Sequence, residues 1–181
     1  TLKWVAIGLA ILVLGSEMYR HFASFEPGEI AYVDANSSFK DGSYDKALEL
    51  YREALKEKPD FAPALRGLAN TYVQLKQYDK AIQAYAKVIN SNQEKLDEKA
   101  VLGQAWCVLQ SGKIDSAVVV FAQHRKNFTG ENYAHASFGL ATAYFRSKQY
   151  EKAIQTFPLA LNSSEGKQVS QLLEKSLYYV G

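Results

Sequence analysis

The chain has 181 residues, of which 48% are hydrophobic and 22% are charged, and its formal net charge is +2. A chain of this length and apolar content can bury a full core in one domain. The net charge is small, and Lys and Arg are spread rather than clustered, so neither indicates nucleic-acid binding. The single cysteine, Cys107, excludes an internal disulfide bond and a cysteine-rich metal site.

The first 25 residues differ in composition from the rest of the chain. Residues 4–15 are an uncharged apolar run of 12 residues, which matches the apolar region of a signal peptide and is short for a membrane span. No good small-x-small cleavage site follows this run, which favours a membrane anchor over a cleaved signal peptide. An uncleaved signal peptide and a buried core helix are the alternatives.

We expect residues 1–25 to form an N-terminal transmembrane helix. Extension of the apolar run to residues 2–19 gives 18 residues, which span about 27 Å as a helix if Glu17 lies at the membrane interface. Residues 2–19 would then contact membrane lipid. The charges that flank the apolar run weakly favour a cytoplasmic N-terminus in a single-pass protein. Lys3 and the amino terminus lie on one side of the run, and Arg20 and Glu17 lie on the other. The remaining chain would then lie on the opposite side, periplasmic or equivalent.

A short pattern, most often an aromatic residue followed three places later by alanine, recurs through the rest of the chain. The alanines of its four copies are spaced by 34, 36 and 36 residues: Ala47, Ala81, Ala117 and Ala153. Self-similarity at this period is the mark of a helical repeat array. The aromatic residue closes the turn between two antiparallel helices, and the alanine lies where their backbones approach too closely for a larger side chain.

The expected elements begin after a linker at residues 26–30, where Pro27 and Gly28 interrupt the apolar helix. Four helix pairs then follow, at about 29–40 with 44–58, 62–74 with 78–90, 97–110 with 114–126, and 133–146 with 150–161. A last helix at about 165–179 has amphipathic spacing suited to capping the array, with Val169, Leu172, Leu173 and Val180 on one stripe. We therefore divide the chain into an anchor (1–25), a linker (26–30), a repeat array (31–162) and a capping helix (163–181).

The four repeats resemble the tetratricopeptide repeat family over residues 29–162. Small residues recur at the eighth place of that motif, and aromatic residues at the twenty-fourth: here these are Ala35, Ala69, Ala105 and Ala141, then Tyr51, Tyr85, Phe121 and Phe157. Asp34 and Gln104 depart from the leucine usual at the seventh place. The resemblance implies an all-α fold, a right-handed α-solenoid of about four helix pairs. Its first helices would line a concave groove for a peptide or a partner helix.

The resemblance assigns partner binding to the outward side of the first helices. The residues we expect there are Tyr32, Phe39, Arg66, Asn70, Leu102, Trp106, Phe138 and Phe145. Any one aromatic residue could instead pack in the core, but a set of them on one surface typically marks a contact. Arg66 and Asn70 would fit the first pair of a clamp for acidic chaperone tails. The later clamp places hold Gly103, His135 and Gly139, which argues against such a clamp.

The sequence gives no indication of catalysis. Of the three histidines, His21 lies at the expected membrane edge, and His124 and His135 are separated by a loop with no carboxylate at ligand spacing. No phosphate loop or nucleophile elbow occurs. Cys107 is best explained as a small buried thiol. We therefore expect no catalytic residue, no metal ion and no cofactor.

We interpret the sequence as a membrane-anchored repeat scaffold that binds other proteins and is not an enzyme. It could be an adaptor or assembly factor that takes a partner segment into the groove. The alternative is a permanent accessory subunit of a larger membrane complex, whose anchor packs on other membrane helices. Ala6, Gly8 and Ala10 would permit such close helix packing.

Overall fold

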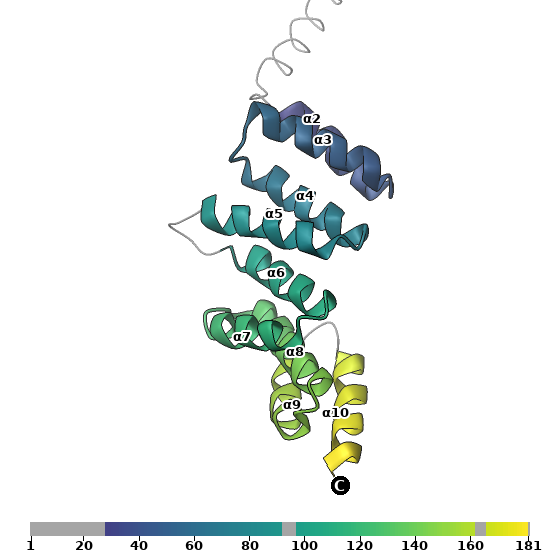
Figure 1. The fold of residues 1–181 in the computed structure, drawn as a ribbon, viewed down its shortest axis with the longest axis vertical. Helices are drawn as coiled ribbons and strands as arrows, with labels where there is room; N and C mark the ends of the chain where they lie inside the picture. The colour runs from purple at the N-terminus through teal and green to yellow at the C-terminus, as the bar shows by residue number, and fades with distance from the viewer. Residues whose placement is uncertain (1–27, 92–96, 162–165, 181) are drawn as a thin grey trace, which may run out of the picture. The chain divides into compact units, whose positions relative to one another are not determined.

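The computed structural model describes residues 28–91, 97–161 and 166–180, which contain only helices and turns (Figure 1). The chain divides into two compact units, residues 1–61 and 62–181. The first unit contains α2 (Glu29–Lys40) and α3 (Tyr44–Glu57). The second contains α4 (Ala62–Gln74), α5 (Tyr78–Ser91), α6 (Glu98–Gln110), α7 (Ile114–Arg125), α8 (Gly130–Arg146), α9 (Tyr150–Thr156), the 3-10 helix η1 (Phe157–Ala160) and α10 (Gly166–Val180).

The expected anchor, residues 1–25, lies outside the described residues. None of the helices that the structure describes is long and apolar enough to span a membrane. The all-α fold and the order of the helix pairs are confirmed.

The first helix of each pair ends in the same hydrogen-bonded turn. After α2, the N–H of Gly42 donates to the carbonyl of Phe39 (3.1 Å), and that of Ser43 donates to the carbonyl of Ser38 (2.9 Å). These are the two bonds of a Schellman motif, and α4, α6 and α8 end with the same pair of bonds. The motif needs one residue in the left-handed region. The four residues in this place are Gly42, Lys76, Gly112 and Lys148, with φ of 75°, 55°, 82° and 61°.

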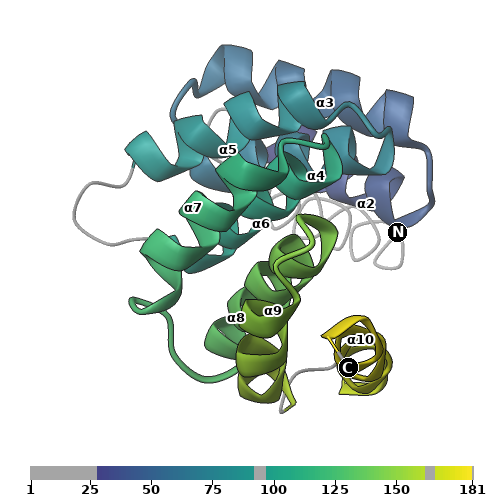
Figure 2. The same cartoon turned by 60° about the horizontal axis from the view of Figure 1, so that its bottom comes forward.

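In the second unit the first helices of successive pairs pack against one another: α4 on α6, α6 on α8, and α8 on α10. Each second helix packs against its own first helix and against the first helix of the next pair. Thus α5 contacts α4 and α6, while α7 contacts α6 and α8 (Figures 1 and 2). This arrangement is that of an α-solenoid. We refer to α4, α6 and α8 together as the first-helix layer.

The alanines that define the repeat are fully buried. Ala47, Ala81, Ala117 and Ala153 are all 0% exposed. Their burial confirms the repeat frame deduced from their spacing.

Two glycines of the first-helix layer accept an aromatic ring from the preceding helix pair. A methyl group added at Gly103 would lie 2.5 Å from Cζ of Tyr85, and one added at Gly139 would lie 2.3 Å from Cζ of Phe121. Both distances are far below van der Waals contact. Each ring therefore packs directly on the backbone of the next first helix and couples successive pairs.

Two helix ends differ from the sequence-based expectation. Helix α8 begins at Gly130, before the expected residue 133, and the N–H of Tyr133 already donates to the carbonyl of Thr129 (3.3 Å). The last second helix is α-helical only to Thr156 and continues as η1. Pro158 accounts for this change because it has no N–H to donate to the carbonyl four residues earlier.

Helix α10 packs on the last pair through one face. Val169 is fully buried, and Leu172 and Leu173 lie against a cluster that includes Phe138 and Phe157. Val180, expected on the same stripe, is 48% exposed in the last turn of the helix.

Candidate functional site

In the first unit, the two expected binding residues take part in the packing of the α2–α3 pair. The Tyr32 ring lies 6.2 Å from Tyr51 and 5.1 Å from Phe61, measured between ring centroids. Phe39 meets Tyr44 edge to face at 5.5 Å. Both side chains are half-buried, so part of each remains on the surface.

The other six expected residues all belong to the first-helix layer. They are Arg66 and Asn70 on α4, Leu102 and Trp106 on α6, and Phe138 and Phe145 on α8. Asn70 is exposed, and Arg66, Trp106 and Phe145 are half-buried. Leu102 and Phe138 are only 9% and 5% exposed. The layer therefore presents four of these side chains to solvent at least in part.

Phe138 lies mainly in the core. Its ring packs between Trp106 (5.7 Å between centroids) and Phe157 (6.4 Å), in the cluster that α10 covers. Leu102 packs in the neighbouring cluster around Leu140. Each offers little area to a partner, so a binding role for Phe138 or Leu102 stays a prediction.

Trp106 and Phe145 form the apolar part of the surface. Trp106 packs against both apolar clusters of the second unit and meets Phe121 edge to face, with ring centroids 5.6 Å apart. The ring centroid of Phe145 lies 5.7 Å from that of Tyr150 and 6.2 Å from that of Tyr179. These contacts hold both rings in place while leaving part of each accessible.

Asn70 forms the polar part, and a buried tyrosine fixes its orientation. The hydroxyl of Tyr85 donates to Oδ1 of Asn70 at 2.6 Å, and Tyr85 is only 4% exposed. Burial, followed by the nearby Cys107, raises the pKa of Tyr85 above its ordinary value. The hydroxyl therefore stays protonated and remains a donor. Because Oδ1 is engaged, the amide NH₂ group of Asn70 is available at the exposed end of the side chain.

The same pair occurs in the first unit. The Tyr51 hydroxyl donates to Oδ1 of Asn36 at 2.7 Å, and burial, with a smaller effect of Tyr32, raises the pKa of Tyr51 to about 12. In the last two repeats the tyrosine place holds phenylalanine, so no such bond can form. Sequence reasoning missed these pairs, although their signal was visible as Asn and Tyr 15 residues apart.

Arg66 is neutralised by an ion pair. Its Nη1 lies 2.8 Å from Oδ2 of Asp97, whose other oxygen accepts from the N–H of Ala100 at 3.0 Å. The side chains are 37% and 17% exposed. The guanidinium charge is therefore partly satisfied inside the protein, which further weakens the case for a clamp on acidic tails.

The described residues contain no group of three or more side chains that could hold a metal ion. Cys107 is 2% exposed, and its burial raises the pKa of the thiol to about 11. A thiol with so high a pKa is protonated at neutral pH and is a poor nucleophile.

Comparison with known proteins places this arrangement in a family. Residues 38–99 and residues 102–166 each match a tetratricopeptide repeat model, and together the matches span more than half of the chain. The chain therefore belongs to the tetratricopeptide repeat family.

Among curated relatives, the chain is similar to Tetratricopeptide repeat protein 21A of Homo sapiens, with 30% identity over 134 residues, 66% of this chain and 10% of that protein. It is also similar to Photosystem I assembly protein Ycf3 of Synechococcus sp. (strain CC9605), with 30% identity over 96 residues, 49% of this chain and 56% of that protein. The chain thus spans less than two thirds of the length of these relatives.

Two solved structures share the fold. YrrB, described as a TPR protein with an unusual peptide-binding site, aligns with a TM-score of 0.70 and 16% identity, over 90% of this chain and 82% of that one. MamA aligns with a TM-score of 0.66 and 17% identity, over 86% and 88% of the two chains. At these identities the likeness shows the fold alone.

Proposed function

We propose that this chain is a scaffold that binds a partner polypeptide on its first-helix layer. The observation that carries the proposal is that Asn70 and Trp106 hold equivalent places on the adjacent helices α4 and α6. Each is held by a buried aromatic residue of a second helix, Tyr85 of α5 and Phe121 of α7. A rigid exposed amide beside a rigid, half-exposed ring suits recognition of an extended or helical segment.

The two kinds of group have separate tasks. The NH₂ group of Asn70 donates to a main-chain carbonyl of the partner, which does not depend on the partner's side chains. Trp106 and Phe145 take up apolar side chains, because large aromatic rings supply most of the energy of typical interfaces. Binding that depends on burial rather than on charge persists at moderate salt concentration.

The similar proteins support a binding role without naming a partner. YrrB is described as having a peptide-binding site, and Ycf3 as an assembly protein. Proteins of this repeat family generally serve as non-enzymatic scaffolds, and binding requires only the surface described above.

The proposal includes a single-pass membrane anchor at residues 1–25, in contact with lipid through residues 2–19. The apolar run in the sequence motivates it, and the N-terminus would be cytoplasmic with the repeats on the opposite side. Removal of residues 1–25 should release the protein from membranes in fractionation while circular dichroism shows unchanged helicity. Release of the full chain by carbonate would contradict the anchor.

The proposal has two forms: the chain is an adaptor, or it is a permanent subunit of a membrane complex. The stoichiometry of the partner distinguishes them. The test is a pull-down of the full chain in mild detergent, followed by mass spectrometry. A partner at equal stoichiometry supports the permanent subunit, and partners in trace amounts support the adaptor.

The same pull-down locates the surface. Asn70→Ala and Phe145→Ala should each lose most of the partner. The matched controls are Asn90→Ala on α5 and Leu159→Ala on η1, both of which change exposed side chains. Asn70→Ala leaves the buried hydroxyl of Tyr85 without its acceptor and should melt at a lower temperature, so circular dichroism must show that every variant is fully folded at the temperature of the pull-down. Full retention by Asn70→Ala and Phe145→Ala would contradict binding on the first-helix layer.

A further inference from the structure

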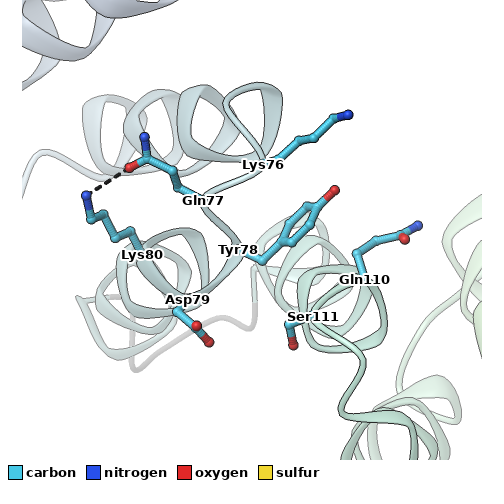
Figure 3. A pocket seen from close by; sticks show the side chains of 7 residues that line it. All are labelled: Lys76, Gln77, Tyr78, Asp79, Lys80, Gln110 and Ser111. Atoms are coloured by element: carbon cyan, nitrogen blue, oxygen red, sulfur yellow. Dashed lines mark hydrogen bonds between the residues drawn. The ribbon is translucent and has the colours of Figure 1, made fainter.

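A polar pocket lies where the turn between α4 and α5 meets the end of α6 (Figure 3). Its volume is about 500 Å³, and its lining residues are Lys76, Gln77, Tyr78, Asp79, Lys80, Gln110 and Ser111. This volume is within the usual range for ligand sites, about 300–1,000 Å³, but such sites are mostly apolar. The pocket is therefore suited to a polar or charged group.

Of the three charged side chains that line the pocket, one has an ion pair among the described residues. Asp79 accepts an ion pair from Lys113, with Oδ1 and Nζ 2.8 Å apart. The ammonium of Lys80 donates to Oε1 of Gln77 at 2.9 Å. Lys76 is exposed, and its ammonium has no ion-pair or hydrogen-bond partner in the part of the chain that the structure describes. Lys76 and Lys80 therefore both keep an ammonium charge that no carboxylate in the described part of the chain pairs.

The side chains of Lys76, Tyr78 and Gln110 extend to the same side of the pocket, whereas Asp79 and Ser111 point to another (Figure 3). Together they offer an ammonium, a phenol hydroxyl and an amide NH₂ group. All three can donate hydrogen bonds.

The backbone at Lys76 is left-handed, as it is at Lys148 in an equivalent turn. Lys76 occupies the left-handed place of the Schellman turn with φ of 55°, where the turns after α2 and α6 have glycine. A non-glycine residue in this region carries a cost in stability. Glycine would close the turn with less strain, so the lysine side chain can be removed by substitution without a loss of stability.

We propose that this pocket binds the carboxylate of an aspartate or glutamate side chain of the partner polypeptide. The inference rests on the proposed function and adds that the partner carries an acidic residue beside the segment held by Asn70 and Trp106. Of the two ammonium groups, only that of Lys76 lies on the side where Tyr78 and Gln110 extend (Figure 3), and one ammonium matches the single charge of a carboxylate better than the double charge of a phosphate. Tyr78 and Gln110 then donate to the carboxylate oxygens.

The test uses small probes, so it does not require the partner. N-acetyl-glutamate N-methylamide is titrated at millimolar concentration into ¹⁵N-labelled protein and followed by NMR. We expect saturable shifts at the amides of residues 76–78 and 110–111, and none with the matching glutamine probe. Equal shifts with both probes would overturn the inference. N-acetyl-glycine carries the carboxylate of a chain terminus. Stronger binding of this probe would show that the pocket takes a C-terminal carboxylate and would overturn the assignment to a side chain.

The decisive variant is Lys76→Gly. It removes the ammonium and also relieves the left-handed strain, so the melting temperature should stay the same or rise while probe affinity falls about tenfold, as for a lost charge-assisted bond. Lys76→Arg should retain binding. The matched control is Lys148→Gly, which makes the same change in an equivalent turn with φ of 61° and should leave the affinity unchanged.

Unchanged probe affinity in Lys76→Gly would overturn the inference. Asn70→Ala should bind the probe normally, because Asn70 lies outside the pocket. A failure of this inference is therefore distinguishable from a failure of the proposed function, which Asn70→Ala tests with the whole partner.

Discussion

At the residue scale, two glycines determine how closely successive helix pairs approach. We predict that Gly139→Ala lowers the free energy of unfolding by about 1–3 kcal/mol, because the added methyl group overlaps the buried ring of Phe121. This loss exceeds the gain in helix propensity of about 0.5–1 kcal/mol. Urea denaturation followed by circular dichroism measures the change.

The control for this prediction is Gly166→Ala. Its added methyl group would lie 3.4 Å from the carbonyl oxygen of Leu161, an ordinary contact. It should therefore be neutral or slightly stabilising. Equal stability of Gly139→Ala and wild type would show that the ring of Phe121 does not rest on the backbone of α8.

Buried acidic groups make the fold sensitive to alkali. Burial raises the pKa of Cys107 from 9.0 to about 11 and that of Tyr51 from 10.0 to about 12. The unfolded chain releases these protons first, so this contribution to stability is complete below about pH 9 and is lost as pH rises through the folded values. We predict a urea midpoint that falls steadily above about pH 9. An unchanged midpoint up to about pH 11 would contradict the burial of these groups.

At the element scale, the alanine of each second helix sets the packing within its pair. Ala81 is 0% exposed, whereas Ala86, on the same helix, is partly exposed. We predict that Ala81→Leu costs about 1–3 kcal/mol by overpacking and that Ala86→Leu costs much less. Thermal unfolding of both variants is the measurement, and equal melting temperatures would contradict the repeat frame.

Helix positions were predictable because each repeat carries its own start and stop signals. The alanine spacing set the frame, and the turn residues set the ends of the first helices. The exceptions are the start of α8 at Gly130 and the end of α9, where a single proline at 158 replaces the last turn with η1. Two residues replace the leucine usual at the seventh place of the repeat, and both have a local explanation. Asp34 is exposed, so its carboxylate is in solvent. Gln104 is hydrogen-bonded, because its Nε2 donates to the carbonyl of Ile82 at 3.2 Å.

The candidate surface was only partly predictable. The repeat frame identified the helices that carry it, but not how far neighbouring elements cover each side chain. Phe138 is buried because it packs on Trp106 and Phe157, in a cluster closed by Val169 of α10. Asn70 gained its defined orientation from Tyr85, a contact between two helices whose signal in the sequence is only the 15-residue spacing of the two residues. Burial and pairing of this kind depend on tertiary packing.

At the scale of the whole molecule, the second unit contains its own core. Both apolar clusters around Trp106 are formed by residues between 62 and 181. We predict that residues 62–181 alone fold into a helical protein with one cooperative thermal transition. Circular dichroism tests this, and a non-cooperative or largely unfolded fragment would show that the second unit depends on residues 1–61.

The central claim is that the partner binds on the first-helix layer of this unit. Hydrogen–deuterium exchange with and without the partner tests it most directly. We predict that the partner slows exchange in peptides from α4, α6 and α8 and leaves α5 and α7 largely unchanged. Protection confined to α5 and α7 would contradict the claim and would move binding to the second helices.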